Sequence, residues 1–97
     1  MSVKINFQPG AREEIADAVV WYEEKRVGLG NVFLEELKII VSRLPNYPES
    51  FEKKRKSYRV APFRRFPYVL IYEFADGVIV IYSVLHAHTD PEKRFKK

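Results

Sequence analysis

The spacing of hydrophobic positions changes twice along the 97-residue chain. Residues 3–7 alternate apolar and polar side chains, which predicts a short strand. Apolar residues then recur every three or four positions as far as the prolines near the middle of the chain, which is the helical period. The two-residue period returns afterwards and predicts strands at 57–62, 64–75 and 78–85. The predicted fold is therefore α+β, in the order β-α-α-β-β-β, with a helical hairpin packed on a small, mainly antiparallel sheet in a single domain covering residues 1–97.

The first predicted helix collects its apolar side chains on one face: Ala11, Ile15, Ala18, Val19 and Tyr22. Pro9 suits a first helical turn, where a backbone N–H has no helical partner to lose. Gly28 and Gly30 interrupt the pattern, so we expect the helix to end near Arg26. Acidic residues lie largely off the apolar face, as expected of a helix with one side toward solvent.

A second helix follows after only a few residues, and Asn31 is its predicted N-cap. Its apolar stripe comprises Phe33, Leu34, Leu37, Ile40, Val41 and Leu44. Pro45 and Pro48 end the pattern, because proline cannot continue a helix. The short connection predicts that the two helices form an αα-hairpin.

Trp21 and Val20 lie off the main stripe of the first helix. We interpret this as burial on two sides, because a helix packed against both a sheet and a second helix needs a wide apolar face. The alternative is that Trp21 faces a partner.

The last two predicted strands are joined by Asp76 and Gly77. Asp-Gly between apolar runs predicts a tight hairpin, because both turn residues need a positive φ angle. Residues 78–85 are almost wholly apolar and are expected to form a central strand covered on at least one face. Pro67 lacks a backbone N–H, so the start of the preceding strand is expected at an edge or a bulge.

Charge is distributed unevenly between the two halves of the chain. Residues 1–50 contain six Lys/Arg and eight Asp/Glu, whereas residues 51–97 contain eleven and five. The basic half indicates an anionic partner, either nucleic acid or an acidic protein segment, and the alternative is a solvated surface with no partner. Cysteine is absent, which excludes disulfides and a cysteine nucleophile. No apolar run approaches the ~20 residues of a membrane span, so we expect a soluble, cytoplasmic protein that does not bind membranes.

His86 and His88 are the only histidines, and they follow the last predicted strand in the motif HAHTD. A metal site would need further histidine, cysteine or carboxylate ligands close by, and the chain has no third histidine and no cysteine. We therefore expect neither a metal ion nor a cofactor. A serine nucleophile is also disfavoured, since Gly-x-Ser-x-Gly is absent, and no glycine-rich phosphate loop follows a strand.

The stretch EKKRKSYRVAPFRRF is basic and interleaved with aromatic residues, which is typical of sites that hold phosphates and stack on bases. Five of its cations are predicted to bind the anionic partner: Lys53, Lys54, Arg55, Lys56 and Arg64. If Arg59 and Arg65 lie on neighbouring strands, they would flank a groove capped by His86 and His88. Such a groove would suit metal-independent cleavage of RNA through the 2′-hydroxyl, with the arginines holding the phosphate and the histidines exchanging protons. The alternative is a solvated loop beside the polar end of a strand.

Three segments carry a resemblance to a known family: AREEIADAVVWYEEKRVGLGNVFLEEL, RRFPYVLIYEF and VLHAHTDP. From about Val3 to Arg94 the chain resembles the RelE/ParE superfamily of bacterial type II toxin–antitoxin toxins, on its ParE-like, plasmid-stabilisation side. The resemblance implies a growth-inhibiting toxin that a cognate antitoxin protein neutralises in a hetero-oligomer, with the basic cluster binding either nucleic acid or the antitoxin. Some relatives cleave mRNA on the ribosome, whereas ParE-like relatives inhibit DNA gyrase.

Compared residue by residue, the resemblance favours the gyrase branch. Arg59, Arg65 and His86 match regions that carry functional side chains in mRNA-cleaving relatives. Val69 stands where many relatives have arginine, and the motif HAHTD has histidine and threonine where relatives often have two arginines. We therefore expect a gyrase-inhibiting toxin. The alternatives are a ribosome-dependent mRNA endonuclease that uses the two arginines and the two histidines of the predicted groove, and an inactive homologue that only binds its antitoxin.

Overall fold

The helices and strands follow the predicted order, with one short strand added. The computed structural model describes residues 3–55 and 57–88. Its elements are β1 (Lys4–Phe7), α1 (Pro9–Lys25), α2 (Leu29–Arg43), β2 (Lys53–Arg55), β3 (Tyr58–Pro62), β4 (Tyr68–Ala75) and β5 (Val78–His86). The addition is β2, which forms within the basic stretch where the sequence pattern indicates no strand.

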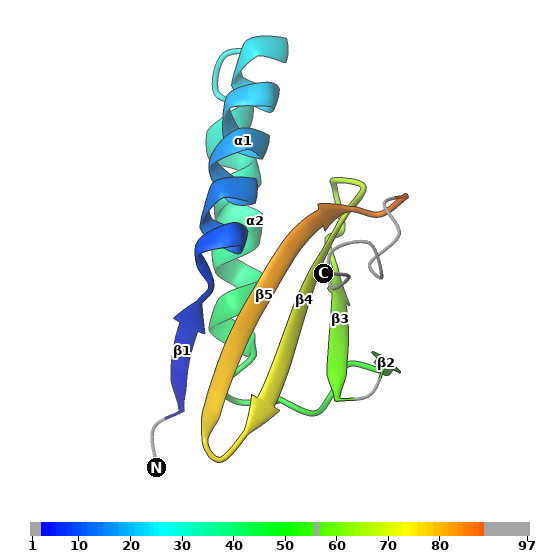
Figure 1. The fold of residues 1–97 in the computed structure, drawn as a ribbon. Helices are drawn as coiled ribbons and strands as arrows, with labels where there is room; N and C mark the ends of the chain where they lie inside the picture. Colours follow the sequence, from blue (N-terminus) through cyan, green and yellow to red (C-terminus); the bar gives the residue numbers. More distant parts are fainter. Residues whose placement is uncertain (1–2, 56, 89–97) are drawn as a thin grey trace.

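The five strands form one sheet in the order β1-β5-β4-β3-β2. β1 runs parallel to β5, and all the other neighbours are antiparallel. The two helices lie side by side over one face of the sheet, and the tip of the hairpin extends past the end of the sheet (Figure 1). The predicted α+β fold, a helical hairpin on a mainly antiparallel sheet, is confirmed. β5 is central as predicted, since it pairs with both β1 and β4.

The link between the helices is shorter than predicted, because α2 begins at Leu29. Gly28 precedes it in a left-handed conformation with a φ angle of +90°. The carboxylate of Glu23, near the end of α1, accepts hydrogen bonds from the N–H groups of Gly28 at 2.9 Å and Gly30 at 3.0 Å. The prediction that Asn31 caps this helix is therefore wrong, because a carboxylate from the preceding helix takes up N–H groups at the start of α2 instead.

β4 and β5 form a hairpin whose two turn residues have positive φ angles, +53° at Asp76 and +74° at Gly77. This confirms the predicted Asp-Gly turn. β4 begins at Tyr68, later than predicted, and residues 64–67 form a loop. Pro67 explains the difference, since it has no N–H to donate to a neighbouring strand.

Aromatic rings fasten the loop between β3 and β4 to the helices. Phe33 of α2 is fully buried and stacks on Phe63 with ring centroids 5.0 Å apart. Phe66 meets Phe33 edge-on at 5.1 Å and Tyr22 of α1 at 4.7 Å. Tyr68 approaches Phe33 from the start of β4 at 5.1 Å. Because such pairs contribute about 0.5–1.5 kcal/mol each beyond the apolar area they bury, this cluster is a strong link between the hairpin and the sheet.

The outer side of α1 is exposed. Trp21 and Val20 expose 54% and 56% of their surface. α1 does pack against both α2 and the strand β5, as predicted, but this contact does not extend to Trp21 and Val20, so the prediction that they are buried is wrong. Ala11 and Ala18 are buried and let the neighbouring elements approach α1 closely. Lys25 Nζ lies 4.1 Å from the centroid of the Trp21 ring, which is a cation–π contact typical of an exposed tryptophan.

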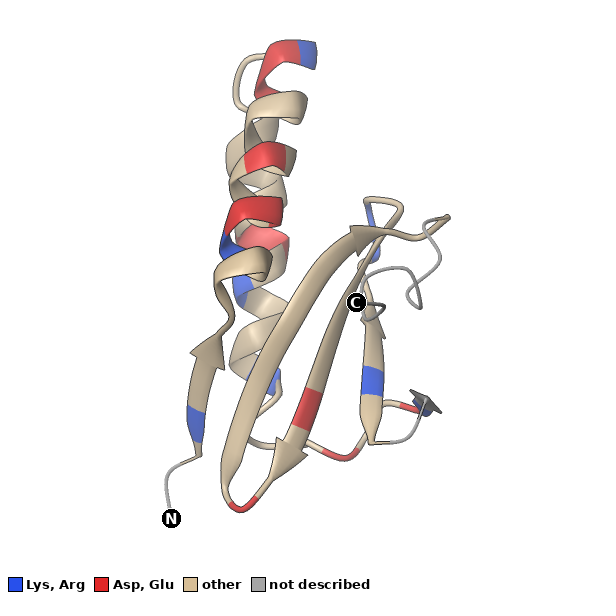
Figure 2. Cartoon of the chain, in the orientation of Figure 1, with Lys and Arg blue, Asp and Glu red and all other residues tan. Residues whose placement is uncertain are grey.

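Charged residues are also distributed by element. Acidic side chains gather along α1, whereas β5 carries no lysine, arginine, aspartate or glutamate (Figure 2). Within the described residues, neither helix combines the length and the apolar composition that crossing a membrane requires.

Gly30 lies where the two helices touch, and this contact is testable. A Cβ atom at Gly30 would lie 2.9 Å from the carbonyl oxygen of Val19, which is backbone and cannot rotate away. We expect Gly30→Ala to lower the free energy of unfolding by about 1–3 kcal/mol, because the clash outweighs the gain in helix propensity. Urea denaturation followed by circular dichroism measures the change. Asn31→Ala, at the next and exposed position, is the control and should not destabilise; equal stability of both variants would contradict the close approach.

Candidate functional site

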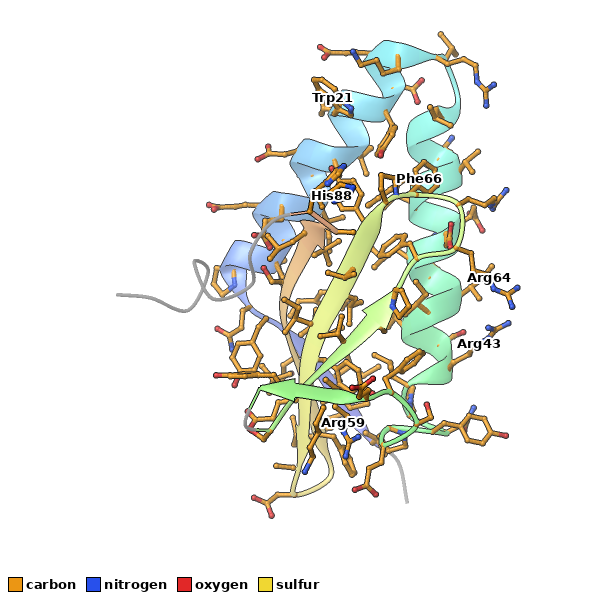
Figure 3. The ribbon with its side chains drawn as sticks, turned by 90° about the vertical axis from the view of Figure 1, so that its right-hand side faces the viewer. Trp21, Arg43, Arg59, Arg64, Phe66 and His88 are labelled. Carbon is orange, nitrogen blue, oxygen red and sulfur yellow. The ribbon has the colours of Figure 1, made fainter. Side chains whose placement is uncertain are left out.

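Arg59 and the two histidines, which were predicted to share a ribonuclease groove, lie at different levels of the sheet. Arg59 is opposite Tyr72 in the β3–β4 ladder, whereas His86 is opposite Tyr68 in the β4–β5 ladder. The four-residue step along β4 between these levels corresponds to about 13 Å of strand. Figure 3 shows Arg59 at the far end of the sheet from His88. The structure therefore does not bring Arg59 to the histidines.

The Arg59 side chain forms hydrogen bonds and an ion pair with other residues of the same chain. Its guanidinium donates hydrogen bonds to the backbone oxygens of Glu49 at 3.1 Å and Phe51 at 2.7 Å, and it lies 3.6 Å from the Glu49 carboxylate. Only 12% of the Arg59 side chain is exposed. Tyr72 supports the same segment, because its hydroxyl donates to the Pro48 oxygen at 2.8 Å. Burial raises the pKa of Tyr72, which keeps this donor protonated, and Arg59 opposes the rise. Arg59 therefore positions the segment between α2 and β2.

Glu36 holds the loop between β3 and β4 on α2. Its carboxylate is buried and accepts hydrogen bonds from the backbone N–H groups of Arg64 and, at 3.1 Å, Arg65. Arg65 Nε also lies 3.8 Å from Glu36 Oε1. A buried carboxylate is tolerated only where such donors replace water. The loop is thereby fixed to the helix, while the Arg65 side chain stays 64% exposed.

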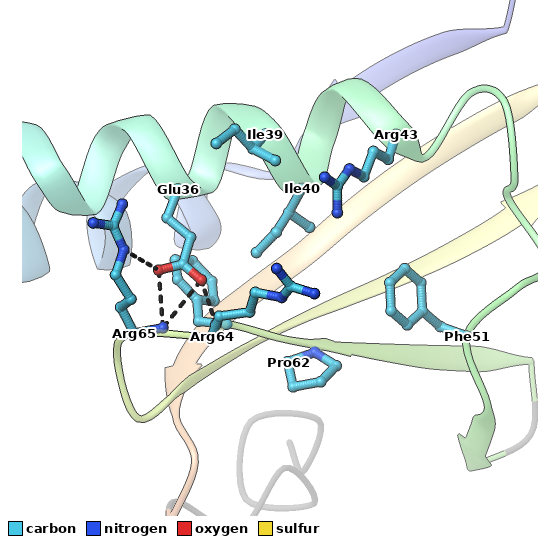
Figure 4. Close-up of a pocket in the computed structure, with 9 residues that line it drawn as sticks. Glu36, Ile39, Ile40, Arg43, Phe51, Pro62, Arg64 and Arg65 are labelled. Atoms are coloured by element: carbon cyan, nitrogen blue, oxygen red, sulfur yellow. Dashed lines mark hydrogen bonds and ion pairs between the residues drawn. The ribbon is translucent and has the colours of Figure 1, made fainter.

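A pocket of about 540 Å³ opens between α2 and this loop, and we call it the arginine pocket (Figure 4). Its apolar lining comprises Ile39, Ile40, Phe51, Pro62 and Phe63. Arg43 extends over the pocket from α2, and Arg64 extends over it from the loop. In the part of the chain that the structure describes, neither of these two guanidinium groups forms a hydrogen bond or an ion pair. The pocket therefore combines an apolar wall with two guanidinium groups that pair with no carboxylate of the described residues.

Two residues of this pocket have no counterpart among the predicted site residues: Glu36 and Arg43. The sequence does carry a signal for them. Glu36 lies three positions after Phe33 and four before Ile40, so it interrupts the apolar stripe of α2, and Arg43 continues the same row. A carboxylate on a core-facing stripe indicates a buried partner, although the stripe alone does not say which one.

His86 lies beside acidic residues of α1, and His88 lies beside His86. Their ring centroids are 5.2 Å apart, and the His88 N–H donates to His86 Nδ1 at 3.3 Å. A shallow cavity of about 310 Å³ next to His86 is also lined by Glu14, Asp17 and Trp21. A phosphate at this place would meet carboxylates, which disfavours it electrostatically. The catalytic roles of both histidines stay predictions.

A second polar cluster links β4 and β5 to the start of β3. Glu73 accepts hydrogen bonds from the hydroxyl groups of Ser57 and, at 3.0 Å, Tyr82. The ring of Tyr82 meets Tyr58 edge-on, with centroids 5.1 Å apart. Burial, followed by the hydrogen bond and the charge of Glu73, raises the pKa of Tyr82 to about 12. Tyr82 therefore remains a protonated donor to Glu73 at neutral pH.

Part of the predicted binding surface lies outside the described residues. This applies to the side chains of Lys54 and Arg55, to the whole of Lys56, and to residues 89 and 90 of the motif HAHTD. Lys53, at the start of β2, is exposed. Within the described ranges, no three histidine, aspartate or glutamate side chains converge as a metal site would require.

Arg59 is expected to contribute to stability. Arg59→Gln removes an ion pair and leaves the backbone oxygens of Glu49 and Phe51 without their charged donor, so the free energy of unfolding should fall by about 2 kcal/mol. Urea denaturation measures this change. Arg64→Gln, at an exposed side chain, is the matched control and should change stability by less than about 0.5 kcal/mol. Equal values for the two variants would mean that Arg59 is free, as a phosphate-binding cation would be.

The raised pKa of Tyr82 should make stability fall at alkaline pH. The folded chain holds this proton up to about pH 12, above the value of 10.0 for an ordinary tyrosine. The resulting stabilisation is complete below pH 10 and is lost as pH rises toward 12, because the unfolded chain releases the proton first. An alkaline titration followed by tyrosinate absorbance measures the ionisation of each tyrosine. The Tyr82→Phe variant should lack the ionisation step at the highest pH that the wild-type chain shows. Loss of an earlier step instead would contradict the assignment.

A comparison with protein families identifies the chain by sequence. A sequence model of the family described as "ParE toxin of type II toxin-antitoxin system, parDE" matches residues 5–91. No curated protein sequence gives a significant match.

Solved toxin structures share the fold. A chain of the chromosomal ParDE toxin–antitoxin system from P. aeruginosa superimposes with a TM-score of 0.72 at 11% identity, covering 88% of this chain and 96% of that one. The isolated E. coli RelE toxin superimposes with a TM-score of 0.68 at 20% identity, covering 98% of this chain and 100% of that one. A chain of the RelBE2 toxin–antitoxin complex from Mycobacterium tuberculosis superimposes with a TM-score of 0.62 at 17% identity, covering 89% of this chain and 99% of that one. At these identities the structures establish the fold, and the sequence match over residues 5–91 establishes more: the chain belongs to the family of ParE toxins of type II toxin–antitoxin systems.

Proposed function

We propose that the protein inhibits growth by acting on DNA gyrase and that a cognate antitoxin protein neutralises it. The match to the ParE toxin family over residues 5–91 carries this proposal. The RelBE2 structure, which shares the fold, is a complex of toxin and antitoxin, and this supports an antitoxin as the partner. Exposed cations in the basic half of the chain, such as Lys53 and Arg64, supply a surface for an acidic partner segment.

The distance of Arg59 from the histidines supports gyrase rather than RNA as the target. Cleavage through a 2′-hydroxyl needs a base, an acid and a cation around one phosphate, each within about 3 Å of the atom that it serves. Arg59 is committed to the backbone of Glu49 and Phe51, about 13 Å of strand away from the level of His86. Val69 adds no cation to β4, in agreement with the gyrase branch.

The second candidate function is a ribosome-dependent mRNA endonuclease. The shared fold with the E. coli RelE toxin over 98% of this chain makes it the natural alternative. The end of β5 and the loop between β3 and β4 are adjacent, because the Ala87 N–H donates to the Pro67 oxygen at 2.6 Å. Arg65, His86 and His88 would then be the groups available at one end of the sheet, with Arg59 acting only through the structure.

Expression of the full chain without an antitoxin tests the proposal. We expect growth arrest, induction of the SOS response, and gyrase–DNA cleavage complexes that can be trapped from the arrested cells. Primer extension on mRNA should show no cut in the ribosomal A site. These outcomes follow if the toxin stabilises broken DNA on gyrase.

Intact DNA beside A-site-cut mRNA would overturn the gyrase mechanism in favour of the endonuclease. In that case His86→Ala and His88→Ala should each be tested, since loss of a proton-transfer group slows cleavage by roughly 100-fold. Normal growth at high soluble expression would instead indicate an inactive homologue that only binds its antitoxin.

A further inference from the structure

Trp21 lies exposed on α1, and the helix face around it has a chemistry that neither mechanism uses. We propose that this face binds a basic, amphipathic segment of a partner protein, which packs an apolar side chain on Trp21 and places cations against Asp17 and Glu24. The inference goes beyond the proposed function, because it concerns an acidic surface and depends neither on gyrase nor on the antitoxin.

Exposed apolar side chains form the centre of this face. Trp21 and Val20 are adjacent in the chain, and each exposes more than half of its surface. The contacts of α1 with α2 and β5 do not extend to them. Tryptophan is enriched among the residues that contribute most to protein–protein binding, because its large ring loses much contact with water at once. Trp21 beside Val20 is therefore a natural anchor for a partner.

Carboxylates flank this apolar centre along the helix (Figure 2). Asp17 lies about one turn before Trp21, and Glu24 lies almost one turn after it. Glu13 extends the row by a further turn. All three carboxylates are exposed, and none forms a hydrogen bond or an ion pair with any of the described residues. Asp17 and Glu24 are seven residues apart, about 10 Å along the helix, so a partner helix with cations at the same spacing matches them.

The other carboxylates of α1 serve the fold instead. Glu14 accepts hydrogen bonds from the Ser83 hydroxyl at 2.7 Å and from the Val84 N–H at 3.0 Å. Glu23 accepts the N–H groups at the start of α2. The acidic side chains of this helix therefore divide into those that hold neighbouring elements and those that face solvent. Only the second group is available to a cationic partner.

The Trp21 ring already contacts one cation. Lys25 Nζ lies 4.1 Å from the ring centroid, so the face of the ring is accessible to an ammonium group. Lys25 is exposed and lies at the end of α1, where its long side chain can rotate away. A lysine or arginine of the partner would take the same place. Lys25 is therefore a competitor of the partner and not part of its binding site.

A shallow cavity beside Trp21 gives the partner a place to insert a side chain. Its volume is about 310 Å³, and Asp17, Tyr68 and His86 also line it. A lysine or arginine there would meet a carboxylate and aromatic rings, which both attract cations. Phosphate groups would be repelled by the same carboxylate, so nucleic acid does not suit this face. Trp21 lies beyond the end of the sheet, which leaves room for a partner along α1 (Figure 3).

The emission of Trp21 tests the proposal directly, because this residue is the only tryptophan of the full chain. The probe is a short peptide without aromatic residues, with leucines between two lysines seven residues apart. A matched peptide has glutamine in place of lysine. We expect the lysine peptide to shift the emission to shorter wavelength in a saturable way, and the glutamine peptide to bind at least about tenfold more weakly. Added salt should weaken the lysine peptide, because the carboxylates are exposed.

Charge variants locate the binding site. Asp17→Asn combined with Glu24→Gln should weaken binding of the lysine peptide by about tenfold. The charge-matched control is Glu35→Gln with Asp76→Asn, at exposed residues outside α1, and it should stay within about twofold of wild type. Lys25→Gln should strengthen binding by about threefold, because it removes the competing cation. Thermal melting checks that every variant is folded.

The apolar contribution is measured with a labelled lysine peptide and fluorescence anisotropy, since the variant lacks the tryptophan signal. Trp21→Ala should weaken binding by about fivefold or more. Ile39→Ala removes another exposed apolar side chain from a helix, here α2, and is the matched control. It should leave the affinity within about twofold of wild type.

Three results would overturn the proposal: absence of saturable binding, equal binding of the lysine and glutamine peptides, or binding that leaves the emission of Trp21 unchanged. An equal loss of binding in the acidic pair on α1 and in its charge-matched control would also overturn it, because general negative charge would then explain the affinity. Weaker binding by Lys25→Gln would contradict competition between Lys25 and the partner at the Trp21 ring.

Discussion

The buried carboxylate of Glu36 is the interaction on which the position of the sheet against the helices depends. A carboxylate taken out of water is unfavourable unless hydrogen-bond donors replace the water. The backbone N–H groups of Arg64 and Arg65 are those donors, so the loop must lie against α2 for Glu36 to be satisfied. The same position brings Phe63 onto Phe33 in the aromatic cluster. Polar satisfaction and apolar burial therefore select one placement of the loop.

This loop also links the stability of the fold to the surface that a partner would meet. The backbone of Arg64 and Arg65 serves Glu36, which leaves the two side chains toward solvent. Phe51 also lines the arginine pocket, and it belongs to the segment whose backbone Arg59 holds. Cations of the basic half thus divide into buried ones that shape the chain and exposed ones that are available for binding. Net charge alone does not make this distinction, because it counts both kinds equally.

The sequence predicted which types of residue form the candidate site, but it did not predict which other residues those side chains contact. The basic stretch and the histidines at the end of a central strand are visible in the sequence, and the structure places His86 at the end of β5. The carboxylates beside it, Glu14 and Asp17, come from α1 at the other end of the chain. Arg59 likewise finds its acceptors on a backbone segment whose path follows no periodicity. A groove of arginines and histidines was a reasonable expectation from composition, and the ladder registers separate Arg59 from His86.

The sequence by itself determined the features that depend on local rules: the order of helices and strands, the apolar stripes of α1 and α2, and the turn at Asp76 and Gly77. Periodicity and φ preferences act over a few residues, so they need no knowledge of the rest of the chain. Only the tertiary structure decided that Trp21 is exposed, that Glu23 rather than Asn31 serves the start of α2, and which cations are free. The physical reason is that a pattern shows which side chains are apolar or charged, whereas the element that covers or pairs with each one is selected by packing between distant parts of the chain.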